Sequence, residues 1–178
     1  MADIFYLCFK ALYSMQRILT SDEINQKMIR LAHQIIEFTY DVPQCYIGGI
    51  TGNGFTMAKA LRNIIRENSN QKIELFEITV NKEKPWSEEV KLSIQEEELK
   101  NGTILLVDDV LNSGKTMQYA LVKFLQQPTT AIKTVAMVDR EHRRYPIKAD
   151  FVGLSLSTTL SDRVEIRLVE DQYEAYLV

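Results

Sequence analysis

Hydrophobic and polar residues alternate along the chain with two periods, which predict a series of helices and strands. Apolar residues recur every three to four positions over residues 22–38 and 55–66, the spacing of a helix that is buried along one face. A third helix is predicted over residues 116–126. Either Ser21 or Asp22 is expected to cap the first helix, because both side chains can accept a hydrogen bond from an amide at a helix start.

Apolar runs between these helices predict strands. Residues 44–50, 104–107 and 132–138 are nearly continuous apolar runs, as expected for strands buried on both faces, and residues 72–80 alternate. Because strands and helices alternate, the sequence predicts one α/β domain with a parallel sheet that helices cover on both faces. Ligands on such sheets bind beyond the carboxyl ends of the strands. Shorter strands are expected at residues 91–94, 150–154 and 164–169.

The first residues do not fit this pattern. We expect residues 1–16 to form an N-terminal extension before a single domain of residues 17–178, and we expect Met15 to be a candidate start of the patterned chain. The apolar run at residues 4–9 follows an acid rather than basic residues, and no small-residue cleavage site comes after it. A secretory signal is therefore not expected.

Composition favours a cytoplasmic protein without a membrane segment. The net charge is −3 and the pI is about 5.5, so the chain as a whole does not attract nucleic acid. The longest apolar run is too short to span a bilayer. Cys8 and Cys45 have no second cysteine or histidine at metal-ligand spacing, which is typical of a protein from a reducing compartment.

The strongest chemical signal lies at residues 104–116. Four apolar residues lead into Asp108 and Asp109, and Ser-Gly-Lys-Thr at residues 113–116 opens the next predicted helix. Adjacent carboxylates can accept hydrogen bonds from sugar hydroxyls or help to hold a divalent ion, and amides at a helix start bind phosphate. A Walker A loop needs a glycine where Asp109 stands, which excludes that class of nucleoside triphosphatase. The pattern therefore predicts a ligand with both sugar hydroxyls and a phosphate.

Other polar segments can add charge or backbone amides to this site. Residues 51–54, Thr-Gly-Asn-Gly, follow a strand and open a helix, so their glycines suit a second phosphate group, although an ordinary turn has the same pattern. Lys82 and Lys84 lie in a predicted mobile loop, where they either cover a negatively charged leaving group or face solvent. A basic cluster at residues 140–148 is either a binding surface or a solvated turn.

Two stretches of the chain resemble a known family. Residues 104–116 resemble the phosphoribosyl-pyrophosphate (PRPP) signature of type I phosphoribosyltransferases. Residues 138–153, which begin Val-Asp-Arg-Glu-His-Arg-Arg-Tyr-Pro-Ile, and residues 30–37 are similar to the PyrR family of bifunctional pyrimidine operon regulators and uracil phosphoribosyltransferases. The similarity covers residues 17–170. It implies an α/β type I phosphoribosyltransferase fold with a small hood region and a flexible loop.

The resemblance implies a reaction and a set of binding residues. Uracil and PRPP would give UMP and pyrophosphate, with Mg²⁺ bound to PRPP and an oxocarbenium-like transition state stabilised by positioning and charge. Asp108 and Asp109 would bind the ribose hydroxyls and the metal ion, and Lys82 and Lys84 would complete the catalytic set. The PRPP site would comprise Thr51, Gly52, Asn53, Gly54, Asp108, Asp109, Val110, Leu111, Asn112, Ser113, Gly114, Lys115 and Thr116.

The resemblance also divides this set between the parts of the substrates. Residues 112–116 would hold the 5′-phosphate, and residues 51–54 would hold the pyrophosphate, in this family often through a strained cis peptide next to Thr51. Residues 81–91 would close over the reaction. The residues near the base would be Asp139, Arg140 and the backbone of Val152.

Several positions depart from the family pattern. Purine-specific relatives carry an aspartate where this chain has Asn112, which argues against hypoxanthine and guanine. The loop at residues 51–54 differs from the Thr-Arg-Gly pattern of many PyrR proteins, and the flexible segment is short and lacks an arginine, which lowers the expected catalytic efficiency. Two alternatives are therefore kept: a UMP-sensing, RNA-binding regulator with little catalysis, or a transferase that uses another base.

Charge on the first predicted helix does not favour RNA as a partner. Lys27, Arg30 and His33 are balanced there by nearby acids, whereas an RNA-binding surface needs a net basic patch. The expected partners are PRPP, a nucleobase and a nucleoside monophosphate. We also expect a homodimer, because members of the resembled family commonly assemble.

Overall fold

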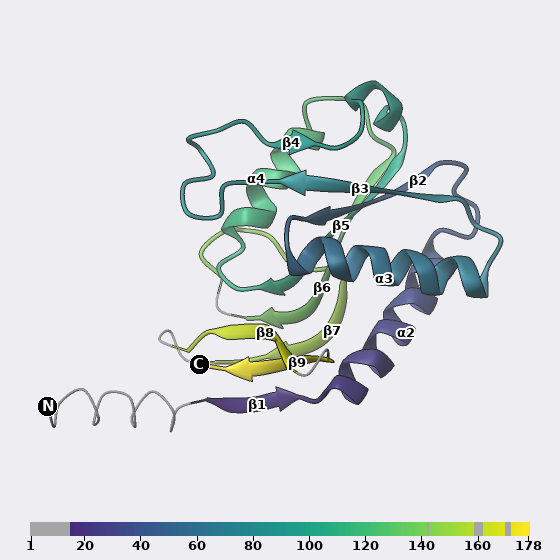
Figure 1. Cartoon of the computed structure of the whole chain (residues 1–178). Helices are drawn as coiled ribbons and strands as arrows, with labels where there is room; N and C mark the ends of the chain where they lie inside the picture. Colours follow the sequence, from purple (N-terminus) through teal and green to yellow (C-terminus); the bar gives the residue numbers. More distant parts are fainter. Residues whose placement is uncertain (1–14, 142, 159–161, 170–171) are drawn as a thin grey trace, which may run out of the picture.

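The computed structural model of the chain describes residues 15–141, 143–158, 162–169 and 172–178 (Figure 1). Strands and helices alternate along it, as predicted. In chain order the elements are β1 (Gln16–Leu19), α2 (Ser21–Phe38), β2 (Cys45–Ile50), α3 (Asn53–Asn68), β3 (Ile73–Thr79), β4 (Lys91–Leu92), the 3₁₀ helix η1 (Glu96–Leu99), β5 (Thr103–Leu111), α4 (Lys115–Phe124), β6 (Ala131–Arg140), β7 (Phe151–Leu156), β8 (Val164–Val169) and β9 (Gln172–Leu177).

A mostly parallel sheet forms the centre of the molecule, which confirms the predicted fold class. Its strand order is β4-β3-β2-β5-β6-β7, and only the short edge strand β4 runs antiparallel to its neighbour. All six residues of β2 are buried, and so are eight of the nine residues of β5. Such nearly continuous burial is expected when helices cover both faces of parallel strands.

Helices pack on both faces of this sheet (Figure 1). Leu31 and Ile35 of α2, together with Leu61 and Ile65 of α3, are fully buried in a cluster on one face. Phe124 of α4 is fully buried in the cluster on the other face. The helical spacing of apolar residues in the sequence therefore marks the faces that are removed from water.

A second, three-stranded sheet with the order β1-β9-β8 forms the hood. Strands β8 and β9 make an antiparallel hairpin, and β1 pairs with β9. In Figure 1 this small sheet lies below the central sheet. Since β1 begins at Gln16, the hood includes the last residue of the predicted extension. The expected extension before Met15, residues 1–14, lies outside the described residues.

Several element boundaries differ from the prediction. The cap of α2 is Thr20 rather than Ser21 or Asp22, because Thr20 and Glu23 form a reciprocal pair of side-chain to backbone hydrogen bonds, at 3.3 and 2.8 Å. Strand β5 continues past Val107 to Leu111, since its backbone stays paired with β6 through the two aspartates.

The start of α3 also differs from the prediction. Gly52 has φ +94°, and this turn lets α3 begin at Asn53 instead of Phe55. None of the peptide bonds between described residues is cis, so the predicted cis peptide at Thr51 is wrong. Within the described part of the chain, no helix is both long and apolar enough to cross a membrane.

Candidate functional site

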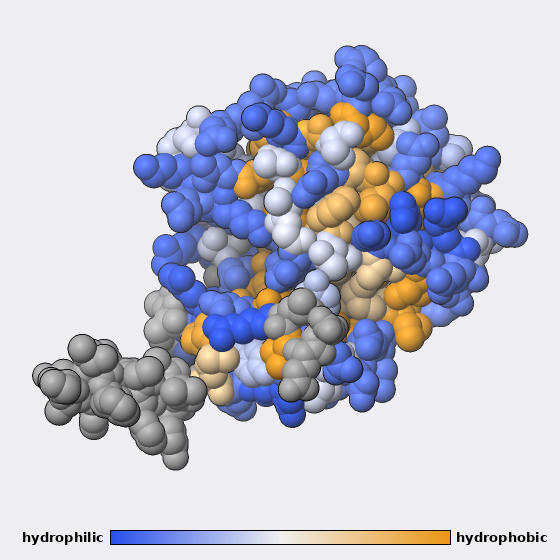
Figure 2. All heavy atoms as spheres, viewed as in Figure 1, coloured by the Kyte–Doolittle hydropathy of each residue, from blue (hydrophilic) through white to orange (hydrophobic). Residues whose placement is uncertain are grey.

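A cavity of about 300 Å³ lies where β5 ends and α4 begins. Figure 2 shows hydrophilic residues over the left side of the molecule, where the carboxyl ends of β2 and β3 lie in Figure 1. Lys82 of the β3–β4 loop and three residues of the hood strand β8 complete the cavity wall. The lining residues are Asn53, Lys82, Asp108, Asp109, Val110, Leu111, Asn112, Ser113, Gly114, Lys115, Thr116, Met117, Val164, Glu165 and Ile166.

Asp108 is the most strongly perturbed acid of this site. Its side chain is buried, and its Oδ1 accepts a hydrogen bond from the Asp109 amide at 3.0 Å. Burial raises the pKa of Asp108 well above its usual range, and the adjacent charge of Asp109 raises it further. The positive charge of Lys82 acts in the opposite direction on this pKa. The site therefore favours a ligand that supplies hydrogen-bond donors or a cation to Asp108.

Asp109 is held in place by Asn53. The Asn53 Nδ2 atom donates to Asp109 Oδ2 and to the carbonyl of Ile166, both at 2.9 Å. These two bonds join the start of α3, the end of β5 and the hood strand β8 at one side chain. Asn53 thus determines how one carboxylate of the site is oriented relative to the hood.

The loop between β5 and α4 has the geometry of an anion site. Gly114 has φ +80°, and a Cβ atom there would lie 2.7 Å from Ile147 Cγ2, so only glycine fits. The amides of Arg144 and Tyr145 both donate to the Ser113 carbonyl, at 3.0 and 3.1 Å, and so anchor the loop to the segment after β6. The Ser113 hydroxyl accepts a hydrogen bond from the Lys115 amide at 3.3 Å, whereas Gly114 at the cap position has no side chain and no acid lies in the first turn of α4. The amides and dipole of this helix start are therefore available to a phosphate.

The predicted second phosphate loop contributes only partly to the cavity. The Thr51 hydroxyl and amide both donate to the Ile78 carbonyl, at 3.1 and 2.9 Å, and anchor the loop to β3. A Cβ atom at Gly54 would lie 3.0 Å from the Val107 carbonyl oxygen, so this glycine permits close packing of α3 on β5. Of residues 51–54, the cavity lining includes only Asn53.

The residues predicted near the base are paired with other parts of the protein. Arg140 Nη1 donates to Asn112 Oδ1 at 3.1 Å, and Arg140 Nε donates to Thr158 Oγ1 at 2.9 Å. Asp139 Oδ2 accepts from Arg143 at 2.6 Å, whereas its buried Oδ1 has no hydrogen-bond partner among the described residues. Only Asn112 lines the cavity, whereas Asp139, Arg140, Arg143 and Thr158 do not.

Two further predicted residues lie away from the cavity lining. The carbonyl of Val152 accepts a hydrogen bond from Arg30 of α2 at 2.9 Å. Lys84 belongs to the β3–β4 loop, where its amide donates to Asn81 Oδ1 at 3.0 Å. The cavity lining includes neither residue.

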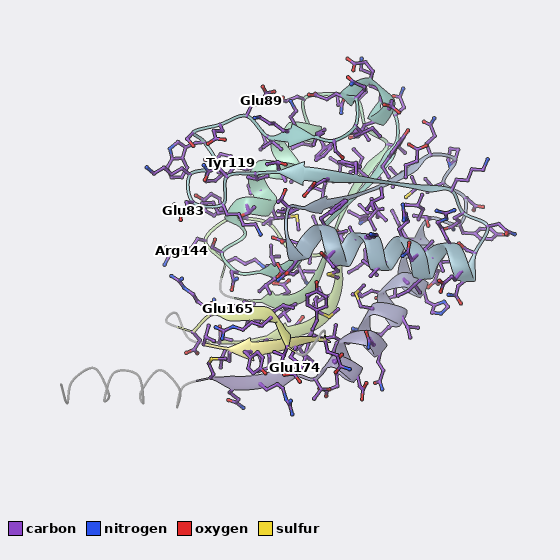
Figure 3. All side chains as sticks on the ribbon, viewed as in Figure 1. Glu83, Glu89, Tyr119, Arg144, Glu165 and Glu174 are labelled. Carbon is purple, nitrogen blue, oxygen red and sulfur yellow. The ribbon has the colours of Figure 1, made fainter. Side chains whose placement is uncertain are left out.

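Sequence reasoning missed the contribution of the hood. Val164, Glu165 and Ile166 line the cavity, but their segment has only the alternation of an ordinary strand. Figure 3 shows Glu83, Arg144 and Glu165 one below another along the left edge, each from a different segment of the chain. A local motif cannot show this arrangement, because it depends on contacts between residues far apart in the sequence.

Comparisons with known proteins agree with this geometry. The family model described as "Phosphoribosyl transferase domain" matches residues 14–173. The bifunctional protein PyrR of Chloroflexus aurantiacus is 31% identical over 163 residues, which cover 87% of this chain and 89% of the relative. PyrR of Corynebacterium glutamicum is 33% identical over 165 residues, with coverages of 86% and 85%.

Solved structures show the same fold at lower sequence similarity. A hypoxanthine-guanine phosphoribosyltransferase (hpt-2) from Bacillus anthracis has a TM-score of 0.70 at 18% identity, covering 91% of this chain and 97% of that chain. A hypoxanthine phosphoribosyltransferase from Staphylococcus aureus has a TM-score of 0.68, also at 18% identity, with coverages of 84% and 79%. The chain therefore belongs to the phosphoribosyl transferase family, as a type I member similar to PyrR.

Proposed function

We propose that this protein transfers the phosphoribosyl group of PRPP to uracil, giving UMP and pyrophosphate. The observation that carries the proposal is the continuity of Asp108 and Asp109 with the start of α4, whose first turn holds no acid, along one cavity. One ligand with vicinal hydroxyls and a 5′-phosphate would match both halves. The identity to PyrR proteins supports the same assignment.

Each part of PRPP has a chemically suitable partner. Asp109, oriented by Asn53, would accept hydrogen bonds from the ribose hydroxyls, while residues 112–116 would hold the 5′-phosphate through amides and hydroxyls. Residues 51–54 would receive the pyrophosphate, because the start of α3 also has no side-chain cap among the described residues. Lys82 would offset the charge of the leaving group from the β3–β4 loop.

The acids of the site also fit Mg²⁺, which we propose to bind together with PRPP. Mg²⁺ prefers oxygen ligands and commonly takes one or two carboxylates together with substrate phosphates. Asp108 and Asp109 are two such carboxylates, and the described residues contain no group of three or more acidic, histidine or cysteine side chains that could hold a metal ion without further ligands. PRPP and water would therefore supply the other ligands, and the ion would neutralise charge on the leaving pyrophosphate.

Polar groups at the end of β6 suit a base that both accepts and donates hydrogen bonds. Arginine can only donate, so the Asn112 oxygen faces Arg140 and the Asn112 amide group stays a donor beside the cavity. The unpartnered Oδ1 of Asp139 is an acceptor, buried at the same end of β6. Uracil would match these two groups, because it has both carbonyl acceptors and N–H donors. Hypoxanthine and guanine also offer such a pair, so the choice of a pyrimidine rests on Asn112, where purine-specific relatives carry an aspartate, and on the identity to PyrR proteins.

A panel of bases tests this proposal. Uracil, hypoxanthine and guanine are each incubated with PRPP and Mg²⁺, and the nucleotide products are separated by chromatography. We expect UMP from uracil, and loss of turnover in the double variant Asp108→Asn with Asp109→Asn. Turnover of a purine without turnover of uracil would refute uracil as the substrate, while the assignment as a phosphoribosyltransferase would stand.

The description of the relatives as bifunctional favours one further candidate function. A UMP-sensing regulator would bind pyrimidine operon leader RNA and change its affinity when UMP is present. Filter binding at low salt, with and without UMP, measures this directly. Negligible affinity for the leader RNA at low salt would exclude this regulatory function.

A further inference from the structure

The side chain of Lys115 points away from the phosphate loop in which its backbone lies. Its ammonium nitrogen donates to the Glu83 carbonyl at 2.9 Å and lies 5.3 Å from the centroid of the Trp86 ring. Glu83 and Trp86 belong to residues 81–90, between β3 and β4, which we call the lid. A charge-assisted hydrogen bond and a cation–π contact therefore join the first residue of α4 to the lid.

The lid is organised by its own hydrogen bonds. Asn81 Oδ1 accepts from the amides of Glu83 and Lys84 at 3.2 and 3.0 Å, and Asn81 Nδ2 donates to Glu88 at 3.1 Å. The Ser87 hydroxyl donates to the Lys84 carbonyl at 2.7 Å. Since these bonds close the segment on itself, a contact that holds one lid residue also limits the movement of its neighbours.

α4 holds the lid at both ends. At the far end, the ammonium of Lys123 is 2.7 Å from the carboxylates of both Glu89 and Glu96, and its side chain is only 9% exposed. At the near end, the Lys115 ammonium holds Glu83. In Figure 3, Glu83 and Glu89 lie on either side of Tyr119 of α4. The helix that begins the phosphate site thus also carries the two lysines that fix the lid.

Fixing Glu83 determines where Lys82 lies. Lys82 precedes the held carbonyl by one residue and lines the cavity together with Asp108 and Asp109. We infer that Lys115 is a positioning residue: its backbone faces the phosphate site, while its ammonium holds the lid so that Lys82 stays over the reacting groups. This inference rests on the proposed function, since it assigns Lys82 to the leaving group.

Trp86 provides a direct measurement, because it is the only tryptophan in the chain. Trp86 is 64% exposed as a residue, so we expect its contact with Lys115, rather than burial, to limit the motion of its ring. Time-resolved fluorescence anisotropy reports nanosecond motion of this ring. In the Lys115→Met variant we expect the amplitude of the fast component to roughly double, because the ring loses its cationic partner.

Steady-state kinetics on the same variants test the consequence for Lys82. Lys115→Met is expected to lower kcat on the order of tenfold, the effect of losing one charge-assisted hydrogen bond, with little change in the KM for the base. Lys115→Arg should restore both readouts, since arginine can also donate to a carbonyl and stack on an indole ring. Lys59→Met removes the same charge from the exposed face of α3 and should leave both readouts unchanged.

Each outcome decides the inference. If the anisotropy of Trp86 is the same in Lys115→Met and wild type, the contact does not hold the lid and the inference is wrong. A rise in the KM for PRPP without a change in anisotropy would show that the ammonium binds phosphate directly. Greater motion of the Trp86 ring with an unchanged kcat in Lys115→Met would show that Lys115 holds the lid without positioning Lys82, and the inference would be wrong. If the wild type converts no base, the proposed function fails, and the anisotropy alone then decides whether Lys115 holds the lid.

Discussion

Loss of Asn53 should disconnect Asp109, which we propose to bind the ribose hydroxyls, from the hood strand β8. Asn53→Ala removes the donor that bonds Asp109 Oδ2 and the Ile166 carbonyl, each at 2.9 Å. A neutral hydrogen bond contributes about 1 kcal/mol net, and a bond to a carboxylate about 1.5–3 kcal/mol. The expected destabilisation is therefore about 3 kcal/mol, or roughly 6–12 °C in Tm for a domain of this size.

Thermal unfolding followed by circular dichroism measures this change, and calorimetric titration with PRPP measures its effect on binding. Affinity for PRPP should also fall, because Asp109 loses the group that orients it. Asn63→Ala is a matched control on the exposed face of the same helix, with an expected change within about 0.5 kcal/mol. If the Tm of Asn53→Ala falls no more than that of this control, the two hydrogen bonds do not stabilise the hood and the reasoning is refuted.

The nearly isosteric change Asn53→Asp gives the same side chain a charge. The charge of Asp109 would raise the pKa of the introduced carboxyl above its value in the unfolded chain. The introduced carboxyl therefore destabilises the fold at neutral pH, and stability returns as the pH falls from the raised pKa toward the ordinary value of the unfolded chain. The Tm difference from wild type should be large at pH 7.5 and smaller at acidic pH, whereas a difference that grows on acidification would contradict the assigned contact.

Three further changes test separate parts of the site. Gly114→Ala should lower the free energy of unfolding by about 2–3 kcal/mol, because φ +80° is unfavourable for alanine and its Cβ would contact Ile147. An unchanged Tm would contradict this geometry. Asp108→Asn should abolish turnover yet raise stability at pH 7.5, since burial opposes ionisation of Asp108 in the folded state but not in the unfolded chain. The gain should shrink as the pH falls below the raised pKa of Asp108 and vanish near the ordinary pKa of an aspartate. A lower Tm at pH 7.5 would overturn the assigned burial effect. Lys123→Met should lower the Tm at neutral pH, because Lys123 lowers the pKa of Glu89, and should have less effect in acid, where protonation of Glu89 removes this pairing. A loss of Tm that does not depend on pH would mean that packing rather than charge matters.

Local patterns predicted most of the fold. The helical spacing predicted α2 and α3, because the same positions that repeat in the sequence are buried against the sheet. The end of β5 was placed too early, since two carboxylates look like the end of a buried run while the backbone pairing continues to Leu111. β1 and β9 were not predicted, because their pairing depends on residues at opposite ends of the chain.

The candidate site was only partly predictable for the same reason. Residues 108–116 form one continuous segment, and the sequence therefore indicated them directly. By contrast, the bond between Asn53 and Ile166 spans 113 positions, and the contact between Lys115 and Glu83 spans 32. Such contacts follow from the packed fold, and residue type or spacing alone gives no sign of them.

The central claim is tested most directly by measuring nucleotide formation from PRPP and uracil in the presence of Mg²⁺, with hypoxanthine and guanine as competing bases. We predict that UMP and pyrophosphate form in equal amounts and that the purines yield no nucleotide. Formation of IMP or GMP in place of UMP would contradict the assignment of a pyrimidine substrate.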